Sequence, residues 1–322
     1  MDRKTLEQYT KNSYLQIGLL ALFLLLYIIT KNSIFGILFA VTLVATVILE
    51  VWMGTKTQGW KAELKDTAIT LGGIVVLWFV LTLVLNSSVP INAVVSCSML
   101  PNVERGDLIL VQGAEPMGYE VDLSPEELAA LQSTETTISA GTLGEFKLNG
   151  SIYSYCSQHK DQVCSLFVAN PEIFTETRGP FTFNYGTCTR VDGNIELLTP
   201  CVESVTFRDE VFYTNLSHDT IVYGPPAGDL YSYTGDIIHR LFFKVNSEGN
   251  TYYLTKGDNN PVFDIQVYDY SVELGNRAPS QDDYKGLILV QIPYLGYPKL
   301  FISGFVSETV NCGTTLEYPT VD

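Results

Sequence analysis

The sequence predicts three N-terminal transmembrane helices over residues 1–86, followed by a mainly β domain over residues 87–322 with twisted antiparallel sheets or a partial barrel. Long apolar stretches fill the first quarter of the chain, and from residue 90 short β-rich runs between turn residues replace them. The charge changes at the same boundary, because residues 1–86 carry a net charge of +2 and residues 87–322 a net charge of −18.

The overall composition excludes several classes of protein. A chain of 322 residues with 46% hydrophobic and 12% aromatic content can bury a large core and is not disordered. Its net charge of −16 repels the phosphate backbone, so we expect no nucleic-acid partner.

Three apolar stretches have the length of membrane-spanning helices. They cover residues 14–30, 34–53 and 67–86, and each comes near the ~20 residues that cross a hydrocarbon core. Buried core helices are the alternative, but three runs so close together, in which Glu50 is the only charged residue, favour membrane spans. No small-x-small cleavage site follows the first run, which argues against a cleaved leader peptide.

The positive charges of the short loops predict the orientation of these spans. Lys and Arg precede the first span and recur between the second and third, whereas the intervening loop has only Lys31. By the positive-inside rule, the N-terminus and the 54–66 loop are cytoplasmic. An odd number of spans then places the domain after residue 86 on the outer face of a cell membrane, as in a multi-pass protein.

The six cysteines all lie beyond residue 86, which agrees with an oxidising compartment. No C-x-x-C pair is present, so a zinc site is disfavoured. Proximity favours the pairs Cys156–Cys164 and Cys188–Cys201, although the sequence leaves the connectivity open. Cys97 is expected to be a small core residue.

The region beyond residue 90 has the pattern of a β protein. A short helix over residues 124–133 is the exception, because Ser124 and Glu127 can form a capping box. Residues 113–217 are rich in Ser, Thr and acidic residues and are interpreted as an inserted subdomain. The β-rich runs are AVV (93–95), DLILVQ (107–112), VTFRDEVFY (205–213), TIVYG (220–224), IIHRLFFKV (237–245), TYYLT (251–255) and GLILVQI (286–292).

Two serines at the end of the first of these runs are candidate catalytic groups. Ser96 and Ser98 are two residues apart, so an extended chain places both hydroxyls on one face. One could attack a carbonyl carbon while the other donates to the developing oxyanion. Taken alone, the S-x-S tripeptide is as consistent with the polar edge of a strand as with a catalytic pair.

His239 and two aspartates are the other candidates. His159 and His218 have polar neighbours and are interpreted as surface-loop residues, whereas His239 lies among strand-forming apolar residues, where a structural role is the alternative to that of a base. Asp258 and Asp264 follow in KGDNNPVFD, which has the composition of a turn and lacks the spacing of an EF-hand.

Together these segments resemble the type I signal peptidases. The blocks SCSM-x-P, GD, DIIHR, TKGDNN with a later Asp, and GLILVQIPYLGYPKL (286–300) stand in the order of that family, and the last resembles its closing strand. The resemblance is strongest to the archaeal and endoplasmic-reticulum branch, in which His replaces the bacterial catalytic Lys. It covers residues 87–112 and 219–302.

The resemblance implies a role for each candidate. Ser98 corresponds to the nucleophile and His239 to the general base. Asp258 and Asp264 correspond to two functional aspartates, one of which orients the histidine, and the sequence does not decide which. Ser96 occupies the place of the oxyanion-hole serine.

The family also implies an activity and its partners. The chain is expected to be a membrane-bound serine endopeptidase that removes signal peptides from exported preproteins after small residues, in the A-x-A pattern. Preproteins, the lipid bilayer and the protein-export machinery are the implied partners, and neither a metal nor an organic cofactor is implied. Shallow pockets lined by the strand over residues 93–97 are expected to select the small residues.

One departure from the family leaves alternatives open. The separation of 141 positions between Ser98 and His239 is unusually long, because residues 113–217 intervene. The catalytic residues can meet only if this insertion leaves and re-enters the domain at neighbouring points. The alternatives are a peptidase dedicated to one pilin-like or surface substrate, and an inactive membrane-anchored binding protein.

Overall fold

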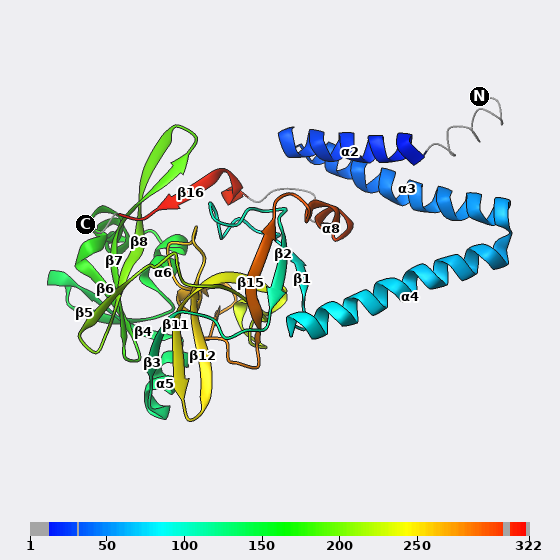
Figure 1. Ribbon diagram of the computed structural model, residues 1–322. Coiled ribbons are helices and arrows are strands. Elements are labelled where there is room, and N and C mark those ends of the chain that lie inside the picture. The colour runs from blue at the N-terminus through cyan, green and yellow to red at the C-terminus, as the bar shows by residue number, and fades with distance from the viewer. Residues whose placement is uncertain (1–12, 31, 305–309, 320–322) are drawn as a thin grey trace. The chain divides into compact units, whose positions relative to one another are not determined.

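The computed structural model describes residues 13–30, 32–304 and 310–319 (Figure 1). The charged residues Arg3, Lys4, Lys11 and Lys31, on which part of the orientation rests, lie outside these ranges. The chain divides into two compact units. The first unit comprises Met1–Val95, Arg105–Leu110 and Val290–Thr309, and the second comprises Ser96–Glu104, Val111–Leu289 and Val310–Asp322.

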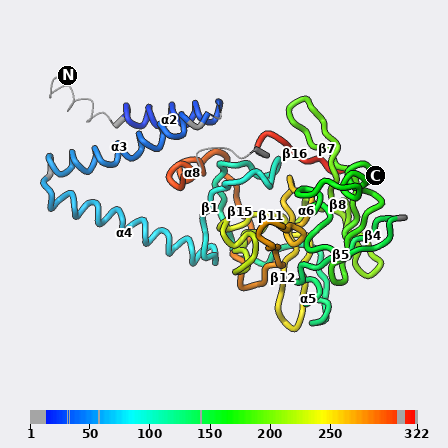
Figure 2. Tube along the Cα trace, turned by 180° about the vertical axis from the view of Figure 1, so that it is seen from behind, coloured from blue at the N-terminus to red at the C-terminus, as the bar shows by residue number. Residues whose placement is uncertain are grey.

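Three apolar helices come first among the described residues of the first unit. They are α2 (Ser13–Thr30), α3 (Ser33–Gln58) and α4 (Trp60–Leu85), and α2 lies along α3 in both views (Figures 1 and 2). Segments Ile34–Lys56 and Trp60–Leu85 are long and apolar enough to cross a membrane, whereas the apolar part of α2 is shorter. The structure therefore provides two N-terminal helices suited to membrane anchoring and one shorter apolar helix.

The predicted loop over residues 54–66 is helical apart from its centre. Helix α3 continues to Gln58 and α4 begins at Trp60, and only Gly59, with a φ of 85°, separates them. Lys, Glu and Ala residues in this stretch favour helix, so both helices extend beyond their most apolar parts.

The rest of the first unit is short. Strand β1 (Ile91–Ala93) pairs antiparallel with β2 (Leu108–Gln112), and Ala93 lies opposite Leu108. The predicted closing segment is a strand only as far as Ile292, because α8 (Tyr297–Ile302) follows. Pro and Gly residues after Ile292 end the strand, and a proline at the start of α8 favours the helix.

In the second unit, the first group of strands carries the candidate histidine. Strand β10 pairs antiparallel with β11 and β15, and β11 pairs antiparallel with β12 and parallel with β3. A separate pair is β13 (Tyr268–Asp269) with β14 (Leu274–Gly275). The bounds are β3 (Tyr119–Asp122), β10 (Thr220–Tyr223), β11 (Ile237–Ser247), β12 (Asn250–Lys256) and β15 (Tyr284–Ile292).

Residues 113–217 supply most of a second antiparallel sheet, in the order β5-β4-β6-β7-β8-β9, with β16 added to β7. Its strands are β4 (Glu135–Ala140), β5 (Glu145–Asn149), β6 (Phe174–Arg178), β7 (Phe181–Asp192), β8 (Ile195–Phe207), β9 (Glu210–Tyr213) and β16 (Thr314–Glu317). The helices of this region are α5 (Pro125–Gln132), α6 (Ile152–Gln158) and α7 (Gln162–Ala169). The capping box of Ser124 and Glu127 is confirmed at the start of α5.

One hydrophobic core serves both strand groups of the second unit. Phe181 and Phe183 from the second sheet are fully buried together with Phe243 of β11 and Phe263 of the loop that precedes Asp264. The rings of Phe181 and Phe243 are 5.1 Å apart, and those of Phe183 and Phe263 are 5.2 Å apart. The inserted residues therefore belong to the same packed body as the candidate site.

Three disulfides close the second unit. Cys156–Cys164 and Cys188–Cys201 are paired as proximity indicated. Cys97 is buried, as expected of a small core residue, and it also forms a disulfide with Cys312 across 215 positions, which the sequence analysis did not predict. No sequence pattern predicts that these two residues are close, because their proximity depends on the pairing of β16 with β7.

Candidate active site

The backbone around Ser98 is fixed by the turn over residues 257–259. The amide N–H of Asn259 donates to the Ser98 carbonyl at 2.7 Å, and its side-chain Nδ2 donates to the Cys97 carbonyl at 3.0 Å. A Cβ atom at Gly257 would lie 2.6 Å from the Ser98 carbonyl oxygen, so only glycine permits this approach. The GDNN segment therefore positions the serine backbone.

Ser98, His239 and Asp264 form a continuous hydrogen-bonded chain. His239 Nε2 lies 2.9 Å from Ser98 Oγ, and His239 Nδ1 lies 2.7 Å from Asp264 Oδ2. The histidine and the aspartate are buried, whereas the serine is half-buried. This is the geometry in which an imidazole takes a proton from a hydroxyl while a carboxylate holds its other nitrogen.

Asp264 is held by two further donors. Its Oδ2 accepts the Tyr223 hydroxyl at 2.8 Å and the Thr255 hydroxyl at 2.6 Å, so strands β10 and β12 both position it. Burial, and then the nearby Asp264 charge, raise the pKa of Tyr223 well above its usual value. The phenol therefore stays protonated and remains a hydrogen-bond donor to the carboxylate.

Asp258 has a different set of partners. Arg240 binds it through two hydrogen bonds of 2.7 Å, and Asn102 Nδ2 donates to it at 2.8 Å. Successive residues of a strand point to opposite faces, so Arg240 and His239 project from different sides of β11. Asp264 is thus the aspartate in contact with the histidine, and Asp258 links β11 to the turn after Ser98.

Ser96 lies beside the candidate nucleophile. Its Oγ is 3.2 Å from Ser98 Oγ, and its side chain is exposed. The two hydroxyls therefore face the same side of the chain.

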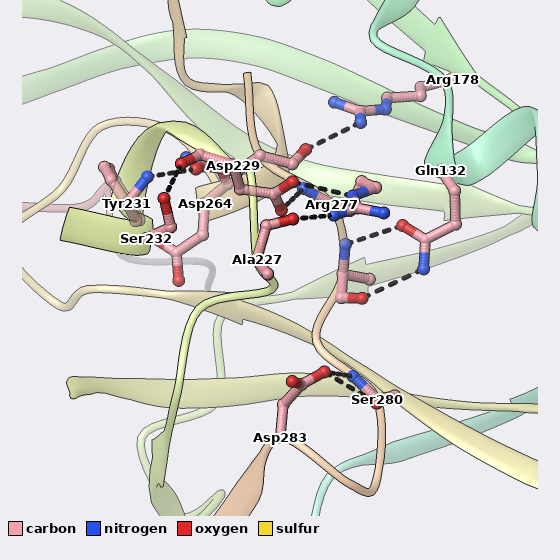
Figure 3. Close-up of polar contacts among 12 residues, drawn as sticks. Gln132, Arg178, Ala227, Asp229, Tyr231, Ser232, Asp264, Arg277, Ser280 and Asp283 are labelled. Carbon is pink, nitrogen blue, oxygen red and sulfur yellow. Dashed lines mark hydrogen bonds and ion pairs between the residues drawn. The ribbon is translucent and has the colours of Figure 1, made fainter. Parts of the chain in front are cut away.

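A network from the inserted sheet supports the loop of Asp264. Asn276 Nδ2 donates to the Asp264 carbonyl at 3.0 Å, and Arg178 Nη2 of β6 donates to the Asn276 carbonyl at 3.0 Å. Arg178 also donates to the carbonyl of Ile265 and is 1% exposed. Figure 3 shows Arg178 in this region, together with the ion pair of Arg277 and Asp229 at 2.8 Å.

Glu176, which lies on β6 as Arg178 does, has a fully buried carboxyl group that contacts the loop of Asp264. It accepts hydrogen bonds from Gln266 at 3.0 Å and Tyr185 at 2.8 Å. Burial raises the pKa of Glu176 from 4.5 to about 7, against the lowering effect of the hydrogen bonds from Gln266 and Tyr185. Between about pH 4.5 and pH 7, the Glu176 carboxyl is therefore protonated in the folded protein and ionised in the unfolded chain.

This difference predicts a pH dependence of stability. The folded-state pKa of Glu176 is the higher one, so stability falls as the pH rises from about 4.5 to about 7, by roughly 3 kcal/mol at most. The melting temperature of the detergent-solubilised protein should decline over this range, and Glu176→Gln should reduce the decline. Glu172→Gln, at an exposed position, is the matched control. Equal slopes for both variants would contradict the buried proton.

The sequence did not identify the residues that hold the candidate groups. Tyr223 and Thr255 are separated from Asp264 along the chain, and a strand pattern gives no indication of such contacts. Lys256 follows Thr255 and is also buried, and burial lowers its pKa to about 7. Alternation turns Lys256 to the other face of β12, where its Nζ lies 3.3 Å from Thr214 Oγ1.

The remaining histidines lie elsewhere. His218, expected on the surface, is buried and places Nδ1 3.2 Å from the Leu241 carbonyl, while His159 stacks on Tyr155. Among the described residues, no group of three His, Cys, Asp or Glu side chains is arranged to hold a metal ion.

Comparisons with known proteins show a distant and partial sequence similarity to two relatives. No protein-family model matches the chain. It is 26% identical over 215 residues to an uncharacterized protein of Methanocaldococcus jannaschii, across 67% of this chain and 84% of that protein. It is 29% identical over 94 residues to sec11, the catalytic subunit of the signal peptidase complex of Schizosaccharomyces pombe, across 27% of this chain and 48% of that subunit. The chain is thus distantly and partially similar to a signal peptidase catalytic subunit, of which the match spans about half.

Proposed function

We propose that this protein is a membrane-bound serine endopeptidase that removes signal peptides from preproteins after small residues. The hydrogen-bonded chain of Ser98, His239 and Asp264 is the observation that carries the proposal. The partial similarity to a signal peptidase catalytic subunit supports the choice of substrate.

The proposed reaction proceeds through an acyl-enzyme. Ser98 Oγ attacks the carbonyl carbon of the scissile bond, and His239 Nε2 takes the serine proton. The imidazolium then gives this proton to the leaving amine as the carbon–nitrogen bond breaks. Water attacks the ester in the second half, and His239 first takes the water proton and then returns a proton to Ser98. Asp264 stays ionised and stabilises the imidazolium.

The oxyanion of each tetrahedral intermediate needs donors next to Ser98. In the proposed mechanism the Ser96 hydroxyl and the Ser98 backbone N–H supply them. The 3.2 Å separation of the two serine oxygens supports this role, because the oxyanion forms close to the attacking oxygen.

Replacement of Ser96 tests the oxyanion role. Ser96→Ala removes one donor and should lower kcat by about 10²- to 10³-fold with little change in KM, because the donor acts on the transition state. Steady-state kinetics on a preprotein substrate measure both constants. Thr187→Ala, at an exposed position of β7, is the control. A change in KM alone would contradict the role.

The proposed location follows from the helices and the disulfides. Two apolar helices anchor the chain in a cell membrane, and the three disulfides of the second unit favour its placement on the extracytoplasmic side. A thiol-reactive probe that cannot cross membranes tests this placement. After reduction of intact cells it should label the second unit without permeabilisation.

Cleavage of a preprotein with an A-x-A site by the detergent-solubilised protein tests the function. The expected product is the mature protein, cut after the second small residue, as identified by mass spectrometry. If a panel of such preproteins remains uncut, the general peptidase is wrong. A dedicated surface substrate or a binding function then takes precedence.

A further inference from the structure

A cavity of about 430 Å³ lies beside the turn that follows Ser98. Four separate parts of the second unit form its walls: this turn, the loop after β9, the turn after β12, and β16 with the residue after it. Asn102 and Asp258 belong both to the cavity and to the hydrogen-bond network of Arg240, which links β11 to the turn after Ser98. The cavity is lined by Pro101, Asn102, Thr214, Leu216, Asp258, Thr315, Leu316, Glu317 and Tyr318.

The lining is apolar inside and acidic at one edge. Pro101, Leu216 and Leu316 supply aliphatic surface, and Tyr318 adds its aromatic ring. The Tyr318 hydroxyl donates to the Asn260 carbonyl at 2.7 Å, so this polar group already has a partner. Arg240 neutralises Asp258 with two hydrogen bonds, whereas the Glu317 side chain is exposed. Such a surface favours apolar side chains and disfavours acidic ones.

The wall formed by β16 is fixed to the nucleophile segment. The disulfide Cys97–Cys312 joins the residue before Ser98 to the residues that lead into β16. Asn259 Nδ2 also bridges the two segments, because it donates to the Cys97 carbonyl at 3.0 Å and to the Thr314 carbonyl at 2.9 Å. The β16 wall of the cavity is therefore joined, by a disulfide and by hydrogen bonds, to the residue that precedes Ser98.

The size of the cavity indicates which part of a substrate it takes. Its volume is within the range of about 300–1,000 Å³ typical of ligand sites, so it is too large for the small residues that precede the cut. Those residues are proposed to lie beside Ser96 and Cys97, on one side of Ser98. An extended substrate that continues past Ser98 then leaves on the other side, where Pro101 and Asn102 line the cavity.

We infer that this cavity is a specificity site for the substrate residues that follow the scissile bond, and that it selects apolar over acidic side chains there. The inference rests on the proposed peptidase function. It assigns to β16 and to the loop after β9 a part in substrate choice that is separate from the chemistry at Ser98.

Two preproteins that differ only in the two residues after the cut test the inference. With Leu-Phe at these positions, kcat/KM for the full chain in detergent should exceed that for Asp-Asp by about tenfold. Leu216→Lys should abolish this preference, because it places a charge on the apolar wall. Leu216 is 62% exposed, so the change leaves the core intact. Leu197→Lys, at a 57% exposed leucine of β8 outside the cavity, should keep the preference.

A binding measurement separates this inference from the proposed reaction. A fluorescent peptide that begins with Leu-Phe should bind the Ser98→Ala protein, and Leu216→Lys in that background should weaken the binding about tenfold. Equal cleavage of both preproteins, or binding that Leu216→Lys does not alter, overturns the cavity inference. If the wild-type protein cuts neither preprotein, the peptidase proposal fails, and the dependence of peptide binding on Leu216 still decides the cavity inference.

Discussion

Ser98→Ala is expected to lower the rate of preprotein cleavage by about 10⁴- to 10⁶-fold, and His239→Ala is expected to have the same effect. The two side chains are 2.9 Å apart and act in one proton transfer, so neither is useful without the other. The double variant should therefore be no slower than either single variant. This non-additivity distinguishes a shared step from two independent contributions to structure.

The measurement is single-turnover cleavage of an A-x-A preprotein by protein purified in detergent. His159→Ala provides a control histidine, because His159 stacks on Tyr155 and belongs to no part of the proposed mechanism. Equal melting temperatures of all the variants would assign the loss to chemistry. Residual activity in Ser98→Ala within tenfold of the wild type would exclude Ser98 as the nucleophile.

Asp264→Asn is the second change with a large expected effect, about 10³- to 10⁴-fold in kcat at neutral pH. The carboxylate accepts from His239 Nδ1, Tyr223 and Thr255. An amide in its place can donate to Nδ1, which would leave the proton on Nε2 and remove the base. It also stabilises the imidazolium less, because it carries no charge.

Asp258→Asn provides the matched comparison within the same loop. Asp258 binds Arg240 and Asn102 and makes no contact with His239 among the described interactions, so its loss should act mainly through position. We expect a decrease of about tenfold in kcat and a lower melting temperature, since the change removes one partner of a buried ion pair. If Asp258→Asn were the more damaging change in kcat at unchanged melting temperature, the roles of the two aspartates would be exchanged.

Local patterns predicted the parts of the fold that depend on nearby residues. The apolar stretches marked the three helices, alternation and turn residues marked strands such as β11 and β12, and Ser124 with Glu127 marked the start of α5. Helices α3 and α4 are longer than the apolar stretches that predicted them, because charged helix-forming residues extend them. The strand order of the second sheet could not be predicted from the sequence, because it depends on pairing between strands that are far apart along the chain.

The candidate residues of the site came from a resemblance rather than from spacing. Ser98 and His239 are 141 positions apart, and only the three-dimensional fold brings their side chains together. The choice between Asp258 and Asp264 required the three-dimensional positions, since either residue of the turn could reach β11. The partner of Cys97 was missed for the same reason.

The disulfide between Cys97 and Cys312 also bears on the order of biosynthesis. Ser98 emerges from the ribosome early, yet the residue that anchors its neighbour is 215 positions later. Translation and translocation must both proceed past Cys312, and an oxidant must then act, before this disulfide can add to the hydrogen bonds by which Asn259 holds the nucleophile segment. A nascent chain caught halfway through export would therefore lack this covalent anchor, and we expect the protein to reach its full proposed activity only on completion of its own passage across the membrane.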